Sequence, residues 1–469
     1  MQKQLINLIL ITAFFVLGRS SNTADAQTVT GGRYHSVFAC SNGTVRAVGA
    51  NILGQLGDGS TLDRTNPVQV SGLLGITSVA GGGEYSIFLK NDGTVWSVGF
   101  NGLGQLGDGT LVDKYIPSQV NGLSGINLLV CGSFHSLFLK DDGTVWAVGS
   151  NGSGQLGDGT TISKSTSIQV IGLSGITSVA AGDRHSLYLK NDGTVLAVGS
   201  NESGQLGDGT SFDKSLPVQV IGLSGITAVA AGDFHSLFLK NDGTVWAVGW
   251  NGYGQIGDGT SVDKSTPVQV SGLSGITSIV AGTAHSLFLK NDETVWAVGS
   301  NYWGQLGDGT TIDKSFPVQV IGLSGITRAA GGSIHSLFLK NEGSVFTVGN
   351  NEFGQLGDGT TVDKSTPVQV LGLCTVATAL EEKFSSNTIS IFPNPCIEEL
   401  FIELTDQAYF QTDFKNTKVE IFDTKGRLLQ SVPLKTKKSM IQTNQLTSGI
   451  YLIQVKSPKG IIVKKFIKN

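Results

Sequence analysis

Short runs of apolar and β-branched residues, separated by turn residues, recur along most of the chain. Between residues 226 and 270 such runs cover positions 226–231, 236–240, 244–248 and 268–270. Runs of this length bounded by Gly, Asn and Asp are typical of β-strands. The pattern predicts four strands in about fifty residues, which is the strand density of a β-propeller blade.

The same unit occurs seven times without an insertion. The hexapeptide Gly-Gln-Leu-Gly-Asp-Gly begins at residues 54, 104, 154, 204, 254, 304 and 354, with Ile256 as its one variation. A second block, which reads His-Ser-Leu-Phe-Leu-Lys-Asn-Asp-Gly-Thr-Val-Trp-Ala-Val-Gly at 235–249, recurs in the same phase. Each four-stranded sheet needs neighbours on both faces, and a closed ring supplies them without capping repeats. We therefore predict a seven-bladed β-propeller over residues 27–373.

One turn in the repeat departs from the others. Asn241-Asp242-Gly243 is typical of a hairpin turn in which glycine takes a positive φ. The sixth unit has Glu293 in place of that glycine. Its turn must either rearrange or contain a strained residue.

The two ends of the repeat array suggest how the ring closes. Residues 28–30 occupy the first-strand position of the first unit, and residues 376–380 fall in the same phase beyond the seventh. We expect these segments to compete for one position or to share one sheet. Four cysteines, Cys40, Cys131, Cys374 and Cys396, lack metal or redox spacing. A pairing of Cys374 with Cys396 is one disulfide that their positions allow.

Composition and charge narrow the class of protein. Glycine contributes 65 of 469 residues and charged residues only 14%, which favours many tight turns. The net charge is −4, although residues 390–469 carry 12 basic and 7 acidic side chains. The repeat array is therefore acidic, and we expect no nucleic-acid partner, because phosphate binding requires a basic face.

Residues 1–26 have the pattern of a secretory signal peptide. Lys3 precedes an apolar run from Leu5 to Leu17, and Ala24-Asp25-Ala26 is typical of a cleavage site. The apolar run is too short to span a bilayer as a helix, and we expect no transmembrane anchor.

The repeat resembles the regulator of chromosome condensation repeat. The resemblance rests on His-Ser-Leu-Phe-Leu, Asp-Gly-Thr-Val-Trp-Ala-Val-Gly, Asn-x-x-Gly-Gln-Leu-Gly-Asp-Gly and Pro-Val-Gln-Val, over residues 28–373. It fits these blocks better than the kelch repeat, whose period is similar. The resemblance implies a propeller that serves as a protein-binding platform. One branch of that family exchanges nucleotide on the Ran GTPase, an activity not expected of an exported chain with uniform units. A secreted bacterial branch, an inhibitor of β-lactamases, is similar in setting.

The period stops after Leu373, and residues 374–387 are expected to form a linker. From 388 to 469 short alternating strands predict a small β-sandwich. This segment, with Ile391-Phe392-Pro393-Asn394-Pro395 and Ser448-Gly449-Ile450-Tyr451, resembles the type A C-terminal sorting domain of the type IX secretion system. The resemblance implies a Bacteroidetes-type bacterium, recognition by that secretion machinery, and a protein that is secreted or held at the outer-membrane cell surface.

Several repeated residue types could bind metal, but a structural role is favoured for each. All six histidines occupy one repeat position, which Tyr85 fills in the second unit, so we interpret them as donors of a repeated structural hydrogen bond. The Asn-Asp-Gly and Gly-Asp-Gly turns offer oxygens that suit calcium, yet lack the dense ligand run of a dedicated loop. We expect no cofactor and no metal. Trp96, Trp146, Trp246 and Trp296 share a strand position and are interpreted as packing between blades.

Function is expected where the seven units differ, because a column identical in all of them serves the ring. Aromatic residues gather in two variable columns, and such side chains dominate protein-binding surfaces. The candidate binding residues are Leu53, Trp250, Tyr253, Tyr302, Trp303, Phe353, Tyr34, Phe134 and Phe234. The alternative is that these loop residues cover the neighbouring blade.

The sequence thus predicts an exported, non-enzymatic propeller that recognises a protein through variable loops on one face. A carbohydrate-binding adhesin is one alternative, because exposed aromatic rings also stack on sugars. A polysaccharide-active enzyme using Glu84, Asp183 and Asp233 is another. No nucleophile elbow, phosphate-binding Gly-rich loop or HExxH motif is present.

Overall fold

The computed structural model describes residues 26–374, 389–404, 418–423, 428–434, 436, 438–457 and 460–469. The chain divides into two compact units at residues 375 and 376. The predicted signal peptide, apart from Ala26, lies outside the described residues, as do residues 376–380. All the secondary-structure elements assigned in the described part are β-strands.

The first unit consists of seven four-stranded antiparallel sheets, each built from consecutive strands. Blades one and two contain β1 (Ala26–Gly31), β2 (His35–Cys40), β3 (Val45–Gly49), β4 (Arg64–Gln69), β5 (Ile76–Gly81), β6 (Tyr85–Lys90), β7 (Val95–Gly99) and β8 (Lys114–Gln119). Blades three to five contain β9 (Ile126–Cys131), β10 (His135–Lys140), β11 (Val145–Gly149), β12 (Lys164–Gln169), β13 (Ile176–Ala181), β14 (His185–Lys190), β15 (Val195–Gly199), β16 (Lys214–Gln219), β17 (Ile226–Ala231), β18 (His235–Lys240), β19 (Val245–Gly249) and β20 (Lys264–Gln269). Blades six and seven contain β21 (Ile276–Ala281), β22 (His285–Lys290), β23 (Val295–Gly299), β24 (Lys314–Gln319), β25 (Ile326–Gly331), β26 (His335–Lys340), β27 (Val345–Gly349) and β28 (Lys364–Gln369).

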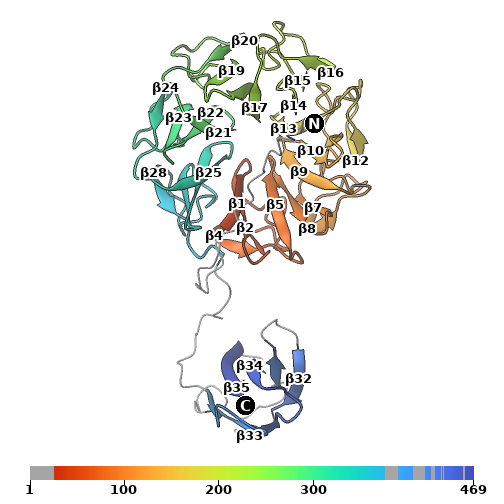
Figure 1. Ribbon diagram of the computed structural model, residues 1–469, viewed down its shortest axis with the longest axis vertical. Coiled ribbons are helices and arrows are strands. Elements are labelled where there is room, and N and C mark those ends of the chain that lie inside the picture. The colour runs from red at the N-terminus through yellow and green to blue at the C-terminus, as the bar shows by residue number, and fades with distance from the viewer. Residues whose placement is uncertain are drawn as a thin grey trace, which may run out of the picture. The chain divides into compact units, whose positions relative to one another are not determined.

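The blades follow one another around a ring, and the first strand of each blade lies nearest the centre (Figure 1). The predicted seven-bladed propeller is confirmed. The fourth strand begins earlier than the apolar run indicated, at residue 264 instead of 268 in blade five. A bulge between Ala247 and Gly249 brings Lys264 opposite Gly249, so the strand continues through polar residues.

The hydrophobic core lies between neighbouring blades. Between blades five and six, for example, Leu237 and Val245 pack with Ile279 and Phe288 in one buried cluster. The four tryptophans of the repeat pack on such clusters, as predicted, although each is only half-buried. Adjacent blades therefore share each core, and the ring supplies every blade with two apolar neighbours.

Among the described strands, none is shared between blades seven and one, where the ring closes. The first strand of blade one is β1, which pairs with β2 and places Val29 opposite Phe38. A disulfide joins Cys40 in β2 to Cys374, just beyond blade seven. The pairing of Cys374 with Cys396 was therefore wrong: Cys396 is a buried free thiol in the C-terminal unit.

The turn of blade six contains a strained residue, which is one of the two outcomes expected from the sequence. Glu293 has a φ of 64°, close to the 77° of Gly243 in blade five. Its N–H donates to the Lys290 carbonyl at 3.0 Å, as the N–H of Gly243 does to Lys240. The turn keeps its geometry, and the strain lies in the positive φ of Glu293.

The second unit contains two antiparallel sheets that share one core. One sheet is formed by β29 (Ile389–Phe392), β30 (Glu399–Leu404) and β33 (Lys438–Gln442), and the other by β31 (Lys418–Phe422), β32 (Leu428–Pro433), β34 (Gly449–Ser457) and β35 (Gly460–Lys468). Leu400, Ile402, Ile421 and Phe466 meet in the core. The predicted small β-sandwich is confirmed. In the described part of the chain, no helix is long and apolar enough to cross a membrane.

Candidate functional site

Two sets of loops lie at the same end of every blade. Each second strand begins opposite the end of the third, as His235 opposite Gly249 in blade five. The turn between strands one and two and the long loop between strands three and four therefore share one face of the ring. This loop face contains residues 32–34 and 50–63 of blade one and their equivalents at intervals of 50. All nine candidate binding residues belong to it.

A buried asparagine organises each long loop. In blade five, the side-chain oxygen of Asn251 accepts from the N–H of Ile256 at 2.9 Å. Its amide nitrogen donates to the carbonyls of Thr260 and Val262 at 3.0 and 3.2 Å. Since Asn251 is fully buried, these bonds fix the loop from within. The Gly-Gln-Leu-Gly-Asp-Gly sequence thus folds into the same loop seven times.

The aspartate of that motif has a structural role in the loop. Asp258 accepts from the N–H and hydroxyl of Thr260 and forms an ion pair with Lys264 at 3.0 Å. Burial alone would raise the pKa of Asp258, but these bonds and the lysine lower it overall. Its oxygens are therefore occupied by partners within the loop. In the described residues, no group of three His, Cys, Asp or Glu side chains could hold a metal ion.

The histidines form hydrogen bonds from blade to blade around the ring. Nε2 of His235 lies 3.0 Å from Oγ of Ser286, and the contact recurs at 2.9 to 3.0 Å between the other histidines and the serines of their next blades. Tyr85 replaces histidine in blade two, with its hydroxyl 3.0 Å from Oγ of Ser136. The predicted structural role, including the substitution by tyrosine, is confirmed.

The serine partner fixes the tautomer of the histidine, and burial fixes its charge state. Oγ of Ser286 donates its proton to the Gln255 carbonyl at 2.9 Å, so Nε2 of His235 must donate to Ser286. Among the described residues, Nδ1 of all six histidines is buried without a partner. Burial lowers the pKa of His235 to about 3 and that of His285 to about 4. The histidines are therefore neutral at pH 7 and unavailable as cations.

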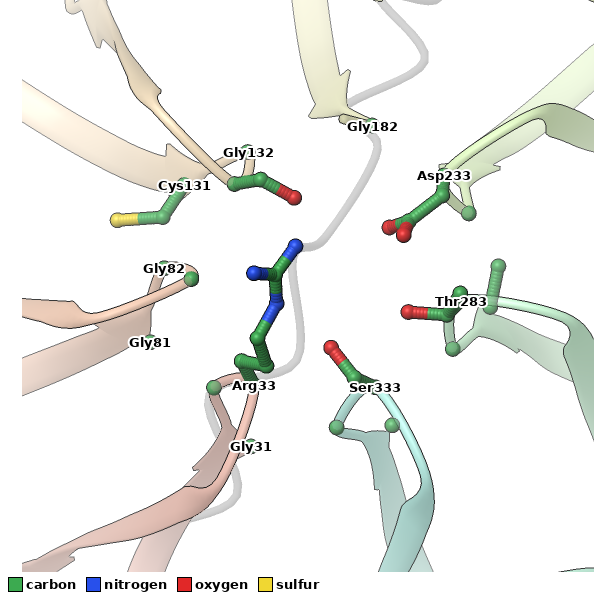
Figure 2. Close-up of a pocket in the computed structure, with 18 of the residues that line it drawn as sticks. Gly31, Arg33, Gly81, Gly82, Cys131, Gly132, Gly182, Asp233, Thr283 and Ser333 are labelled. Carbon is green, nitrogen blue, oxygen red and sulfur yellow. The ribbon is translucent and has the colours of Figure 1, made fainter. Parts of the chain in front are cut away.

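A polar pit opens at the axis of the ring, where the turns between first and second strands converge. Figure 2 shows Arg33, Asp233, Thr283 and Ser333 directed toward the centre from blades one, five, six and seven. The pit has a volume of about 80 Å³, and glycine backbone forms much of its wall. A Cβ added at Gly182 would lie 2.3 Å from the Gly232 carbonyl oxygen, so the wall requires glycine there.

The acidic side chains near the axis differ in their surroundings. Asp183 is buried and forms an ion pair with Arg184 at 3.3 Å. Burial, followed by the charge of Asp183, raises the pKa of Asp233 to about 6. Glu84 does not line the pit. The three acidic residues considered in the sequence therefore do not form one group. Asp183 is ion-paired, Asp233 lines the pit, and Glu84 lies outside it.

An aromatic groove lies on the loop face beside the pit. Its volume is about 770 Å³. Five of the nine candidate residues line it: Phe234, Trp250, Tyr253, Tyr302 and Trp303. Trp250 packs edge-on against Tyr253, and Tyr302 packs edge-on against Trp303, with ring centres 5.2 and 4.8 Å apart. Thr283 and Ser333 line both cavities, so the pit and the groove are adjacent.

The other four candidates lie outside the groove. Tyr34 packs against Phe353, with ring centres 5.2 Å apart, where blade one meets blade seven. Phe134 contacts Phe100 and the Arg33 guanidinium. Leu53 is half-buried. The aromatic column that looked like one arc in the sequence is thus divided into separate clusters.

Sequence reasoning missed a further feature of the loop face, an apolar collar. One loop residue in every blade is apolar and 61 to 73% exposed: Leu62, Val112, Ile162, Phe212, Val262, Ile312 and Val362. In blades two to seven the carbonyl of this residue accepts from the buried asparagine, so the side chain projects outward. The available signal was one apolar loop residue in each blade, which stands between polar neighbours in every blade but the second, where Leu111 precedes Val112.

Comparison with family models identifies both units. Residues 129–385, more than half of the chain, match the RCC1-like domain. Two further segments, 42–89 and 92–139, match the regulator of chromosome condensation (RCC1) repeat, and residues 76–105 match a second model of that repeat. Residues 390–469 match the secretion system C-terminal sorting domain.

Solved structures show the same propeller fold. Human WBSCR16 is 26% identical, with a TM-score of 0.59 over 66% of this chain and 85% of its own. Yeast RCC1 (Prp20), in its complex with Kap60, is 20% identical, with a TM-score of 0.63 over 84% of this chain and 94% of its own. No curated protein sequence matches the chain. The chain belongs to the RCC1-like domain family, and its type IX sorting domain directs it to the secreted or cell-surface compartment.

Proposed function

We propose that this exported propeller is a non-enzymatic binding protein that recognises an extracellular protein through its loop face. The observation that carries the proposal is the aromatic groove, where five aromatic side chains from blades five and six meet around about 770 Å³. Tyr302 and Tyr253 are 71 and 45% exposed. Aromatic side chains give large contact area at little cost in conformational entropy, and they dominate the energetics of protein interfaces.

The apolar collar extends this surface around the face. Seven projecting apolar side chains, one in each blade, recur around the loop face. Ile312 belongs to both the collar and the groove. A protein partner can cover such a wide surface, whereas a small ligand would occupy the groove alone.

Glycan binding is the second candidate, because Ser300, Gln305 and Asp313 add polar groups to the groove. Those groups already have partners, however. Gln305 donates to Ser300 at 3.2 Å, and Asp313 accepts from the N–H of Asn301 at 2.6 Å. Sugar recognition relies on polar groups that can bond to hydroxyls, so the arrangement favours a protein partner.

The test is capture of binding partners by the immobilised full chain, with a glycan array run in parallel. We expect a protein from the culture medium or cell surface to be retained, and to be lost when Tyr253 and Tyr302 are both replaced by alanine. Tyr115→Ala is the matched control, because Tyr115 is 44% exposed but lies outside the groove. Retention of the same partner by the double variant would overturn the proposal, and saturable glycan binding lost in that variant would favour the second candidate.

A further inference from the structure

The axial pit contains two opposite charges that, among the described residues, form no ion pair with each other, although the charge of Arg33 lowers the pKa of Asp233 against the effect of burial. Arg33 and Asp233 point toward the axis from different sides (Figure 2). The guanidinium of Arg33 packs over the Phe134 ring at 5.7 Å. Among the described residues Arg33 forms no ion pair, and the second acid, Asp183, is paired with Arg184 instead. A cation and an anion thus remain available across one cavity.

The wall around Asp233 presents hydrogen-bond acceptors. The backbone N–H groups of Asp233, Thr283 and Ser333 donate to carbonyls of the next blade, at 3.2, 3.3 and 3.1 Å. These donors are therefore occupied, while the carboxylate and the two hydroxyls face the pit (Figure 2). The Thr283 hydroxyl donates to the Asp233 carboxylate and keeps its oxygen lone pairs as acceptors. Three acceptor groups on one side match the three N–H bonds of a primary ammonium.

The opposite side of the pit suits a carboxylate. A guanidinium offers a planar set of donors that binds a carboxylate through two parallel bonds. The volume of about 80 Å³ has room for several water molecules or for the charged groups of a small ligand. Since Thr283 and Ser333 also line the aromatic groove, a side chain attached to such a ligand would point toward that groove.

We propose that the axial pit binds a small zwitterion with a primary ammonium and a carboxylate, such as a free amino acid or a dipeptide with an apolar side chain. Asp233, with Thr283 and Ser333, holds the ammonium, and Arg33 holds the carboxylate. This site goes beyond the proposed protein recognition, because neither Arg33 nor Asp233 belongs to the groove. Failure of either proposal leaves the other standing.

The experiment is calorimetric titration of the full chain with L-phenylalanine, L-phenylalanine methyl ester, N-acetyl-L-phenylalanine and phenylalanylglycine. We expect L-phenylalanine or the dipeptide to bind saturably. The one that binds more tightly indicates the distance between ammonium and carboxylate that the pit accepts. The ester lacks the carboxylate and the acetyl compound lacks the ammonium. Each should bind roughly ten- to a hundredfold more weakly, the value of one charged hydrogen-bonding pair.

Variants assign the two charges. Arg33→Gln should weaken the zwitterion to the affinity of the ester, and Asp233→Asn should weaken it to that of the acetyl compound. Arg328→Gln is the control, because this arginine is exposed and does not line the pit. Thermal melts establish that each variant is folded. Absence of saturable binding by both zwitterions, or equal binding of the blocked compounds, would overturn the proposal.

Discussion

Glu293 shows the cost of one departure from the repeat. The other six blades have glycine at this turn position, where φ is positive. A side chain in this region of φ is strained, by about 1 kcal/mol. Glutamate is tolerated because the turn bonds of blade six are the same as those of its neighbours.

We expect Glu293→Gly to raise the free energy of unfolding by about 1 kcal/mol, because it removes strain without removing a turn bond. Urea denaturation of the full chain measures the change. Gly243→Glu in blade five is the matched reverse substitution and should lower stability by a similar amount. If the two substitutions shifted the midpoint in the same direction, the positive φ at residue 293 would not be the cause.

The long loop is the element that carries most of the variable residues. The residue that fixes its backbone is different from the residues that it exposes. Asn301 holds the loop of blade six through its buried side chain, with Leu306 N–H donating to it at 2.9 Å. Tyr302 and Trp303 follow it directly in the sequence. The loop can therefore change its exposed residues while the buried asparagine keeps the same backbone.

Asn301→Ala should lower the free energy of unfolding by about 1 to 3 kcal/mol, because buried backbone groups lose their partners. It should also weaken binding of the captured partner, since the groove loop is no longer held. Asn201→Ala removes the equivalent network from blade four, outside the groove, and should reduce stability equally but leave binding unchanged. Amide hydrogen exchange of residues 301–312 reports the loosening. Equal binding by both variants would contradict the role of this loop.

The strands and turns were more predictable from the sequence than the grouping of the candidate binding residues. The seven blades, the turn at Glu293 and the role of Tyr85 follow from local patterns repeated in register. The grouping of Phe234 with Trp303, and the separation of Phe353 from them, depend on side-chain packing between blades that no single unit encodes. The apolar collar was missed because function was expected only where the seven units differ, whereas Ile312 belongs to a column that is apolar in every blade and exposed. The bond between Cys40 and Cys374 joins residues 334 positions apart, and only ring closure brings them together.

On the scale of the whole molecule, the ring of buried histidines makes the stability of the folded protein depend on pH. The pKa of each histidine lies at about 3 or 4 in the folded protein, below its ordinary value of 6.5. Between these values the unfolded chain binds more protons than the folded one, so stability decreases as the pH falls below about 6.5. Above that pH the histidines are neutral in both states and contribute no pH dependence.

At pH 5 each histidine should reduce the free energy of unfolding by about 2 kcal/mol relative to pH 7. Urea titrations at both pH values test this. His285→Tyr is the informative variant, because Tyr85 already fills the same position in blade two. It should lessen the loss on acidification by the contribution of one histidine while the protein remains folded. An unchanged pH dependence in this variant would show that His285 does not cause the loss.

Each blade is made of four consecutive strands, and the contact between Ser36 and His335 that closes the ring is the same as those between other blades. The junction between blades seven and one is therefore distinguished by the disulfide and not by its packing. The propeller is, in effect, circularly permutable: new ends placed at another connection between blades would interrupt no sheet. In such a permuted chain Cys40 and Cys374 would become an ordinary cross-link between adjoining blades, and the loop face would be unchanged.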